Sequence, residues 1–122
     1  MNRISNREFN EKMRERTKQF ALQIINITNE MPHKESARII SKQLLRSATS
    51  VAANFRAACR GRSKAEFYSK MCIVVEEADE TQFWLEMLCD SQLTDKCKLK
   101  DMLDECSEII AITTSIKNKL KI

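Results

Sequence analysis

Apolar residues recur every three or four positions along most of the chain, the spacing that places them on one face of an α-helix. No stretch alternates between apolar and polar residues in the manner of a half-buried strand. The 122 residues include one glycine, Gly61, and one proline, Pro32, so few helix-breaking residues interrupt the pattern. The sequence therefore predicts an all-α protein built from long helices.

Breaks in this period divide the chain into four amphipathic segments. Pro32 ends the first segment, and Ser63 begins the third as the N-cap of a capping box that Glu66 completes. Thr94 is a good N-cap for the fourth segment. The predicted helices cover about residues 6–31, 34–60, 63–90 and 94 onward.

One apolar stripe on each segment is expected to form the core. The connections between segments are only a few residues long, which makes successive helices antiparallel neighbours. We therefore expect one domain, residues 1–122, folded as an antiparallel up-down-up-down four-helix bundle. The predicted core consists, segment by segment, of Phe9, Met13, Phe20, Ile24, Ile27 and Met31; Ala37, Ile40, Leu44, Ala48, Val51, Phe55 and Ala58; Phe67, Met71, Val74, Ala78, Leu85 and Leu88; and Leu99, Met102, Leu103, Cys106, Ile109, Ile110, Thr113, Ile116 and Leu120.

The sequence gives no sign of a membrane or secretory segment. No apolar run approaches the roughly 20 residues that a membrane span needs, and residues 1–18 are charged throughout, unlike a signal peptide. We therefore expect a cytoplasmic protein. The five cysteines are odd in number and form no Cys-x-x-Cys pair, which favours free thiols over a disulfide framework or a zinc site.

Candidate catalytic groups are scarce. His33 is the only histidine, it lies beside Pro32 in a predicted turn, and the sequence places no carboxylate or cysteine partner near it. The acidic cluster from Glu76 to Glu80 is more typical of a solvated helix face than of a cation site, because no ligand-rich loop accompanies it. A glycine-rich phosphate loop and a nucleophile elbow are both missing. We expect no enzymatic activity, no cofactor and no metal site.

Charge is distributed unevenly along the chain, although the net charge is only +4. Residues 34–70 contain nine Lys or Arg against two acids, whereas residues 71–108 contain three Lys against eleven acids. The second segment is thus strongly basic, and the stretch from residue 71 to residue 108 is acidic. Such an excess of one sign is unusual for a face that only keeps a helix soluble.

The basic residues of the second segment follow one helical face. At about 100° per residue they project within an arc of roughly 80°, and the row is about 33 Å long. Small residues, Thr49 and Ala53, fill its middle, so we predict a surface that binds nucleic-acid phosphates. The alternative is an ordinary solvated face that pairs with acids of the third helix. The candidate nucleic-acid-binding residues are Arg38, Lys42, Arg46, Arg56, Arg60, Arg62 and Lys64.

The third segment carries more apolar residues than its core stripe accounts for. A second apolar stripe lies roughly 100° or more around the helix, and aromatic residues and Met are enriched at association surfaces. This stripe predicts an oligomer, unless neighbouring helices cover it. The candidate interface residues are Tyr68, Cys72, Phe83, Trp84 and Met87.

The stretch from Gln43 to Met71, QLLRSATSVAANFRAACRGRSKAEFYSKM, resembles a small four-helix-bundle family, the 23S rRNA intervening-sequence proteins. Their central signature is similar to QLRRAAxSIPANIAEGxGRRSKKEF and aligns without a gap. Residues 79–88, DETQFWLEML, are similar to the family's third helix. The chain departs from the signature at Ala52, where many members have Pro, at residues 56–58, where Arg-Ala-Ala replaces Ala-Glu-Gly, and at residues 60–61, where Arg-Gly replaces Gly-Arg. The matching positions are Gln43, Leu44, Arg46, Ala48, Ser50, Ala53, Asn54, Arg62, Ser63, Lys64, Glu66 and Phe67.

This resemblance implies a homo-oligomer, pentameric in the family's known folds, without enzymatic activity and with a link to RNA. A related group of bundles serves as basic accessory proteins to the reverse transcriptases of diversity-generating retroelements. Our leading hypothesis is a homo-oligomer that binds nucleic acid, RNA in preference to DNA, through the second helix. The alternative is an oligomeric protein-interaction module, for example a partner of a reverse transcriptase, with no direct role in nucleic-acid binding.

Overall fold

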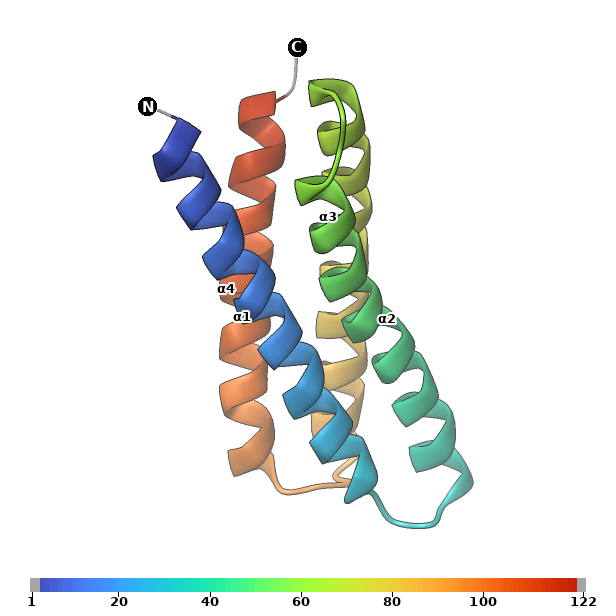
Figure 1. The fold of residues 1–122 in the computed structure, drawn as a ribbon. Helices are drawn as coiled ribbons and strands as arrows, with labels where there is room; N and C mark the ends of the chain where they lie inside the picture. The colour runs from blue at the N-terminus through green and yellow to red at the C-terminus, as the bar shows by residue number, and fades with distance from the viewer. Residues whose placement is uncertain (1–2, 121–122) are drawn as a thin grey trace.

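The computed structural model describes the backbone of residues 3–120 and the side chains of residues 7–95 and 97–120. The described residues form four α-helices joined by short turns, with no strand among them. The chain runs down α1, up α2, down α3 and up α4 (Figure 1), so the predicted all-α, up-down-up-down four-helix bundle is confirmed. The helices are α1 (Arg3–Asn29), α2 (Glu35–Cys59), α3 (Lys64–Asp90) and α4 (Lys96–Leu120).

The helix boundaries follow local capping chemistry. The Ser63 hydroxyl accepts a hydrogen bond from the Glu66 N–H at 3.1 Å, as the capping box predicts. The Glu66 carboxylate turns back to accept from the Arg62 N–H at 2.6 Å, one residue before the cap position at which a capping box usually closes. The prediction of Thr94 as the cap of α4 is wrong by one residue. Asp95 Oδ1 accepts from the Cys97 N–H at 2.9 Å, since an ionised carboxylate at this position can accept from a first-turn N–H.

The core lies where the apolar stripes predicted it. All seven predicted positions of α2 are buried, and so are Met71, Val74, Ala78, Leu85 and Leu88 of α3. In α1 and α4 the stripes are buried at their centres and half-buried at their edges. The core is therefore continuous through all four helices.

Phe9 is the exception, because 45% of its surface is exposed and it does not belong to the core. Phe9 lies only about 20° around α1 from Arg16, which contacts α4, so it faces the side where α1 packs sparsely. Figure 1 shows α1 crossing in front of α4 at an angle. Helical spacing places Phe9 near the inward side of α1, but spacing does not show how closely the neighbouring helix approaches.

Two buried hydroxyls join α2 to α3 within the core. Ser47 and Thr81 are both fully buried, and their Oγ atoms lie 2.9 Å apart in a hydrogen bond. Each hydroxyl also lies within hydrogen-bond distance of a carbonyl in its own helix, so neither is left without a partner. This pair helps to fix how far α3 is shifted along α2.

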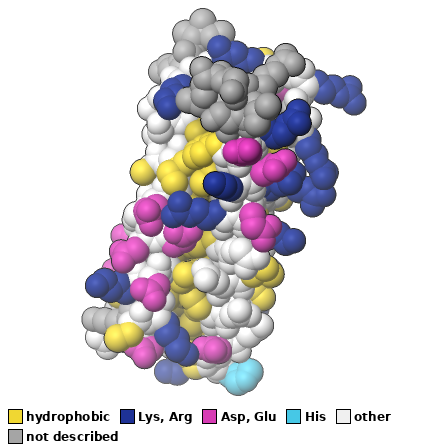
Figure 2. Space-filling view, turned by 60° about the vertical axis from the view of Figure 1, so that its left-hand side comes forward, with side chains coloured by type: hydrophobic (Ala, Val, Ile, Leu, Met, Phe, Trp, Pro, Cys, Tyr) yellow, Lys and Arg dark blue, Asp and Glu magenta, His cyan; other side chains and the backbone are white. Residues whose placement is uncertain are grey.

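The bundle is packed unevenly around its circumference. Each helix packs closely on the helices next to it in sequence, with α2 and α3 most extensively paired, whereas α1 and α4 touch far less. The main polar connection between α1 and α4 is Arg16, whose Nε and Nη2 each donate to Glu105 at 2.7 Å. Glu108 lies 3.3 Å from the same guanidinium. In Figure 2, which brings this side of the bundle forward, hydrophobic side chains reach the surface in a line between flanking charged residues.

None of the helices in the described part of the chain is long and apolar enough to cross a membrane.

Candidate nucleic-acid interface

The seven basic residues predicted to bind phosphates all lie at the surface of the described chain. Four of them follow the outward face of α2 and Arg60 is its C-cap, and Arg62 and Lys64 continue into the turn and the first residue of α3. Thr49 and Ala53 in the middle of the row are also exposed. The Thr49 hydroxyl donates to the Leu45 carbonyl of its own helix at 2.7 Å, so it is not free to donate to a phosphate. The row exists, with a largely nonpolar gap at its centre.

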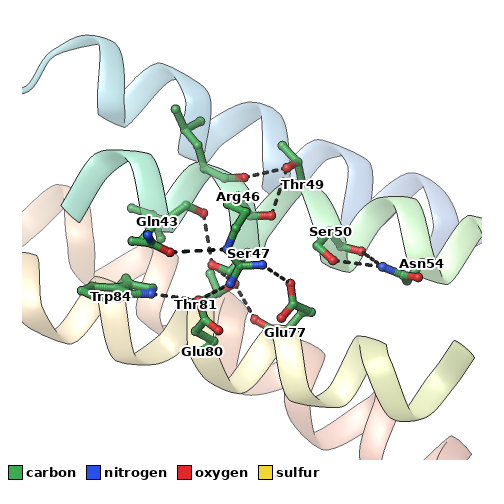
Figure 3. Close-up of polar contacts among 12 residues, drawn as sticks. Gln43, Arg46, Ser47, Thr49, Ser50, Asn54, Glu77, Glu80, Thr81 and Trp84 are labelled. Atoms are coloured by element: carbon green, nitrogen blue, oxygen red, sulfur yellow. Dashed lines mark hydrogen bonds and ion pairs between the residues drawn. The ribbon is translucent and has the colours of Figure 1, made fainter. Parts of the chain in front are cut away.

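Arg46 is neutralised by the neighbouring helix (Figure 3). Its Nη1 donates to Glu77 Oε2 at 2.7 Å, its Nη2 donates to Glu80 Oε2, and its Nε makes a long contact of 3.4 Å with Gln43 Oε1. Trp84 Nε1 donates to the same Glu80 oxygen at 3.1 Å. All three nitrogens of the guanidinium therefore face partners from its own chain.

The pKa values of this group reflect the same contacts. The Trp84 indole N–H and then the Arg46 guanidinium lower the pKa of Glu80 below its ordinary value. Hydrogen bonds from Arg46 to Glu80 and then Glu77 raise the pKa of the arginine. The ionised form of Glu80 is thus favoured, and a phosphate would have to displace two carboxylates to reach Arg46.

The other basic residues of the row differ in their surroundings. Arg38 pairs with Glu35 one turn earlier on α2, and both side chains are about two-thirds exposed. Within the described chain, Lys42, Arg56 and Arg60 make no ion pair, and neither do Arg62 and Lys64. The alternative considered for the whole row, pairing with acids of the third helix, therefore holds for Arg46 and not for the C-terminal half of α2.

Helix α1 adds two basic residues that were not predicted. Arg14 and Lys18 are exposed, and the positive charge of Arg14 acts on the Cys59 thiol at the end of α2. Figure 2 shows Lys and Arg side chains gathered along one upper edge of the molecule, whereas acidic and basic side chains alternate lower on the same face. The spacing of four residues places Arg14 and Lys18 on one face of the helix, which could have predicted this basic pair. The first segment as a whole has nearly equal numbers of acidic and basic residues, so its net charge gave no indication of the pair.

An open cleft lies beside the opposite end of the basic row. It has a volume of about 630 Å³ and lies between the end of α1 and the start of α2, where Met31, His33, Arg38 and Lys42 contribute to its lining. Within this cleft the first turn of α2 lacks a side-chain cap at Lys34. The turn that contains the only histidine thus lines a surface hollow.

The apolar stripe predicted on α3 remains largely open to solvent in the single chain. Phe83 is 50% exposed and Met87 is 39% exposed, whereas Trp84, Tyr68 and Cys72 are half-buried. The rings of Phe83 and Trp84 meet edge to face with their centroids 4.8 Å apart. Neighbouring helices therefore cover only part of the stripe.

The five cysteines are free thiols in different environments. Cys106 is fully buried, and its S–H donates to the Ala78 carbonyl of α3 at 3.3 Å. Burial, reinforced by the charge of Asp79, raises the pKa of this thiol to about 12. Among the described residues, no group of three or more His, Cys, Asp or Glu side chains is arranged to hold a metal ion.

Comparison with known proteins places this geometry in context. A family model described as 23S rRNA-intervening sequence protein matches residues 10–115. Among solved structures, the chain is similar to a protein with unknown function from the S23 ribosomal protein family of Bacteroides thetaiotaomicron. The two chains share 30% sequence identity and a TM-score of 0.82, and the match covers 89% of this chain and 97% of that chain. No curated protein matches the chain.

Proposed function

The chain belongs to the 23S rRNA-intervening sequence protein family, and from this premise we propose that it binds nucleic acid, RNA in preference to DNA, without catalysing a reaction. One observation carries the proposal. The outward face of α2 and the turn after it present exposed cations, of which Lys42, Arg56, Arg60, Arg62 and Lys64 have no ion-pair partner in the described chain.

Backbone phosphates are the ligand that fits such a surface. Arginine presents a planar set of donors that matches a phosphate, and an unpaired surface cation need not first release a carboxylate. Contacts of this kind position a protein on the backbone and carry no sequence information. We therefore propose binding with little sequence preference, carried out in the cytoplasm.

We further propose that the protein works as a homo-oligomer, pentameric as the family resemblance implies. The exposed Phe83 and Met87 supply the apolar surface for association. Several copies would present several basic rows, so a long RNA could bind more than one row at once and gain affinity through effective concentration.

Salt-dependent binding to mixed-sequence RNA tests the proposal. The logarithm of affinity should fall linearly with the logarithm of salt concentration, and Arg56→Ala or Arg60→Ala should each reduce that slope by about one unit. Lys100→Ala is the matched control, because it removes one exposed cation from α4, which is not part of the basic row. Wild-type protein that binds neither RNA nor DNA at low ionic strength would disprove the proposed function. So would charge reversal along the α2 row that leaves binding intact while changes at Lys117, Lys119 and Lys121 abolish it; of these residues, Lys121 lies outside the described residues.

A second candidate function rests on α3. Its exposed Phe83 and Met87 lie close to the acidic residues Glu76, Asp79 and Glu80, a combination that suits docking of a basic protein such as a reverse transcriptase. In that case salt would affect protein–protein association, and nucleic acid would not bind directly. Binding assays with purified RNA in the absence of any partner protein separate the two candidates.

A further inference from the structure

Basic side chains from two helices meet at the end of the bundle that carries the α2–α3 turn. Arg14 of α1 lies close enough to Cys59 for its charge to oppose the rise that burial causes in the pKa of that thiol. Arg14 also lies about 160° around α1 from Arg16, which contacts Glu105 of α4, so it is on the side of α1 toward α2, in the half of the bundle that contains Arg56 and Arg60. Lys18, one turn further along α1, lies about 40° around the helix from Arg14.

These four residues, Arg14, Lys18, Arg56 and Arg60, are called the two-helix patch below. All four are exposed, and none forms an ion pair with any described residue. Glu11, one turn before Arg14 on the same side of α1, offsets part of their charge. Like charges gathered on one surface repel one another, and a polyanion would relieve that repulsion.

We propose that the two-helix patch binds the sugar-phosphate backbone of an RNA duplex, and that α1 supplies two of its four cations. This inference rests on the proposed function. It places the main phosphate-binding surface between α1 and α2, and not at the middle of α2, where Arg46 is neutralised. The axes of packed helices lie about 8–10 Å apart. The patch thus presents cations in two parallel lines, and the single row on α2 becomes one of them.

The absence of aromatic residues from the patch favours a duplex over a single strand. Proteins that bind single strands stack bases on exposed aromatic rings, whereas double-stranded RNA is recognised largely through its backbone and shape. The large exposed aromatic residues of the described chain are Phe9 and Phe83. Phe83 is on α3, and Phe9 lies roughly 140° around α1 from Arg14.

The test uses the full chain, an RNA duplex of two helical turns, a single-stranded RNA of the same length without secondary structure, and a DNA duplex of the same length. Arg14→Gln with Lys18→Gln should weaken binding to the RNA duplex by about tenfold or more at low salt and reduce the salt slope by about two units. The matched control is Lys12→Gln with Lys100→Gln. Lys12 is exposed on the opposite side of α1, and this pair removes the same charge. Circular dichroism and thermal unfolding should show that both double variants fold, since all the altered side chains are exposed.

The outcomes separate this inference from the proposed function. If Arg56→Ala lowers the salt slope while the Arg14 and Lys18 variant keeps it, the two-helix patch is disproved and binding through α2 stands. Single-stranded RNA that binds as tightly as the duplex would overturn the duplex assignment. A DNA duplex should bind within about tenfold of the RNA duplex, because the patch contacts phosphates; no detectable binding to the DNA duplex would contradict recognition through phosphates alone. If no nucleic acid binds at all, both proposals fail.

Discussion

Arg46 and Arg56 are the same residue type on the same helix, and their surroundings differ completely. The first lies opposite Glu77 and Glu80 of α3, and the second has no acid paired with it in the described chain. The difference arises from the alignment of α2 with α3, which the Ser47 and Thr81 contact helps to fix. A cationic side chain can therefore hold helices together at one position and remain available to a ligand ten residues later.

Cys106 makes folding stability depend on pH in the alkaline range. The pKa of its thiol is about 12 in the folded chain, compared with an ordinary value of 9.0. Below about pH 9 the thiol is protonated in both states, and its contribution to stability is fully present. From about pH 9 to about pH 12 the unfolded chain releases this proton and the folded chain does not, so stability falls by up to about 1.4 kcal/mol per pH unit.

Chemical denaturation measured across that pH window checks the prediction. Cys106→Ala removes the titrating thiol, so its stability should decline less steeply than that of the wild type, even though its absolute stability is lower. If the free energy of unfolding falls equally steeply with pH in the two proteins, the buried thiol does not contribute to the pH dependence of stability. The exposed Cys97 provides an internal comparison, because it should react with iodoacetamide much faster than Cys106.

At the scale of single helices, α3 depends on its first turn. Ser63→Ala removes the acceptor of the Glu66 N–H and should lower the free energy of unfolding by about 1 kcal/mol. Urea denaturation with an unchanged m-value would confirm a loss of stability without a change in unfolding cooperativity. Ser69→Ala is the matched control: Ser69 is exposed within the same helix, where alanine is the better helix former. A Ser63 variant as stable as the Ser69 variant would contradict the capping role.

Arg16 should determine how firmly α1 is held against α4. Its pKa is raised above the ordinary value of arginine, mainly by the hydrogen bond to Glu105. Arg16→Met keeps much of the aliphatic stem but leaves Glu105 and Glu108 without their cation, so stability should fall by about 1 kcal/mol. Hydrogen exchange should accelerate in α1 more than in α3.

The control for Arg16 is Lys98→Met. Lys98, in the first turn of α4, pairs with Glu30, which directly follows α1, but both side chains are more than half exposed. An exposed pair contributes little, so this change should leave hydrogen exchange nearly unaltered. Equal effects of the two substitutions would show that the partial burial of the Arg16 contact does not make it more stabilising than the exposed pair.

The order, number and approximate ends of the helices were predictable because Pro32, Gly61 and the capping residues interrupt an otherwise regular apolar period. The partners of individual charges were not, since pairing depends on how far one helix is shifted along the next. That shift decides that Arg46 meets acids and that the charge of Arg14 acts on the Cys59 thiol. The exposure of Phe9 depends on how closely the neighbouring helix approaches, which apolar spacing does not encode.

At the scale of the whole molecule, the open surface of α3 predicts self-association. Phe83→Asp should dissociate the oligomer while helicity is retained, because a carboxylate buried in an interface would lack a partner. Light scattering at micromolar concentration measures the mass. Leu22→Asp is the matched control: Leu22 is 42% exposed on α1 and should leave the assembly intact. Wild-type protein with the mass of one 14.2 kDa chain would disprove both the oligomer and this interface.

The sparse contact between α1 and α4 also has a consequence for folding speed. Most contacts join helices that follow one another in sequence, and the contact with the greatest separation along the chain is the weakest. Such a low contact order predicts folding within about a millisecond or faster. Closure of α1 onto α4 should come after the rate-limiting barrier, so in stopped-flow measurements Arg16→Met should accelerate unfolding and leave the folding rate almost unchanged.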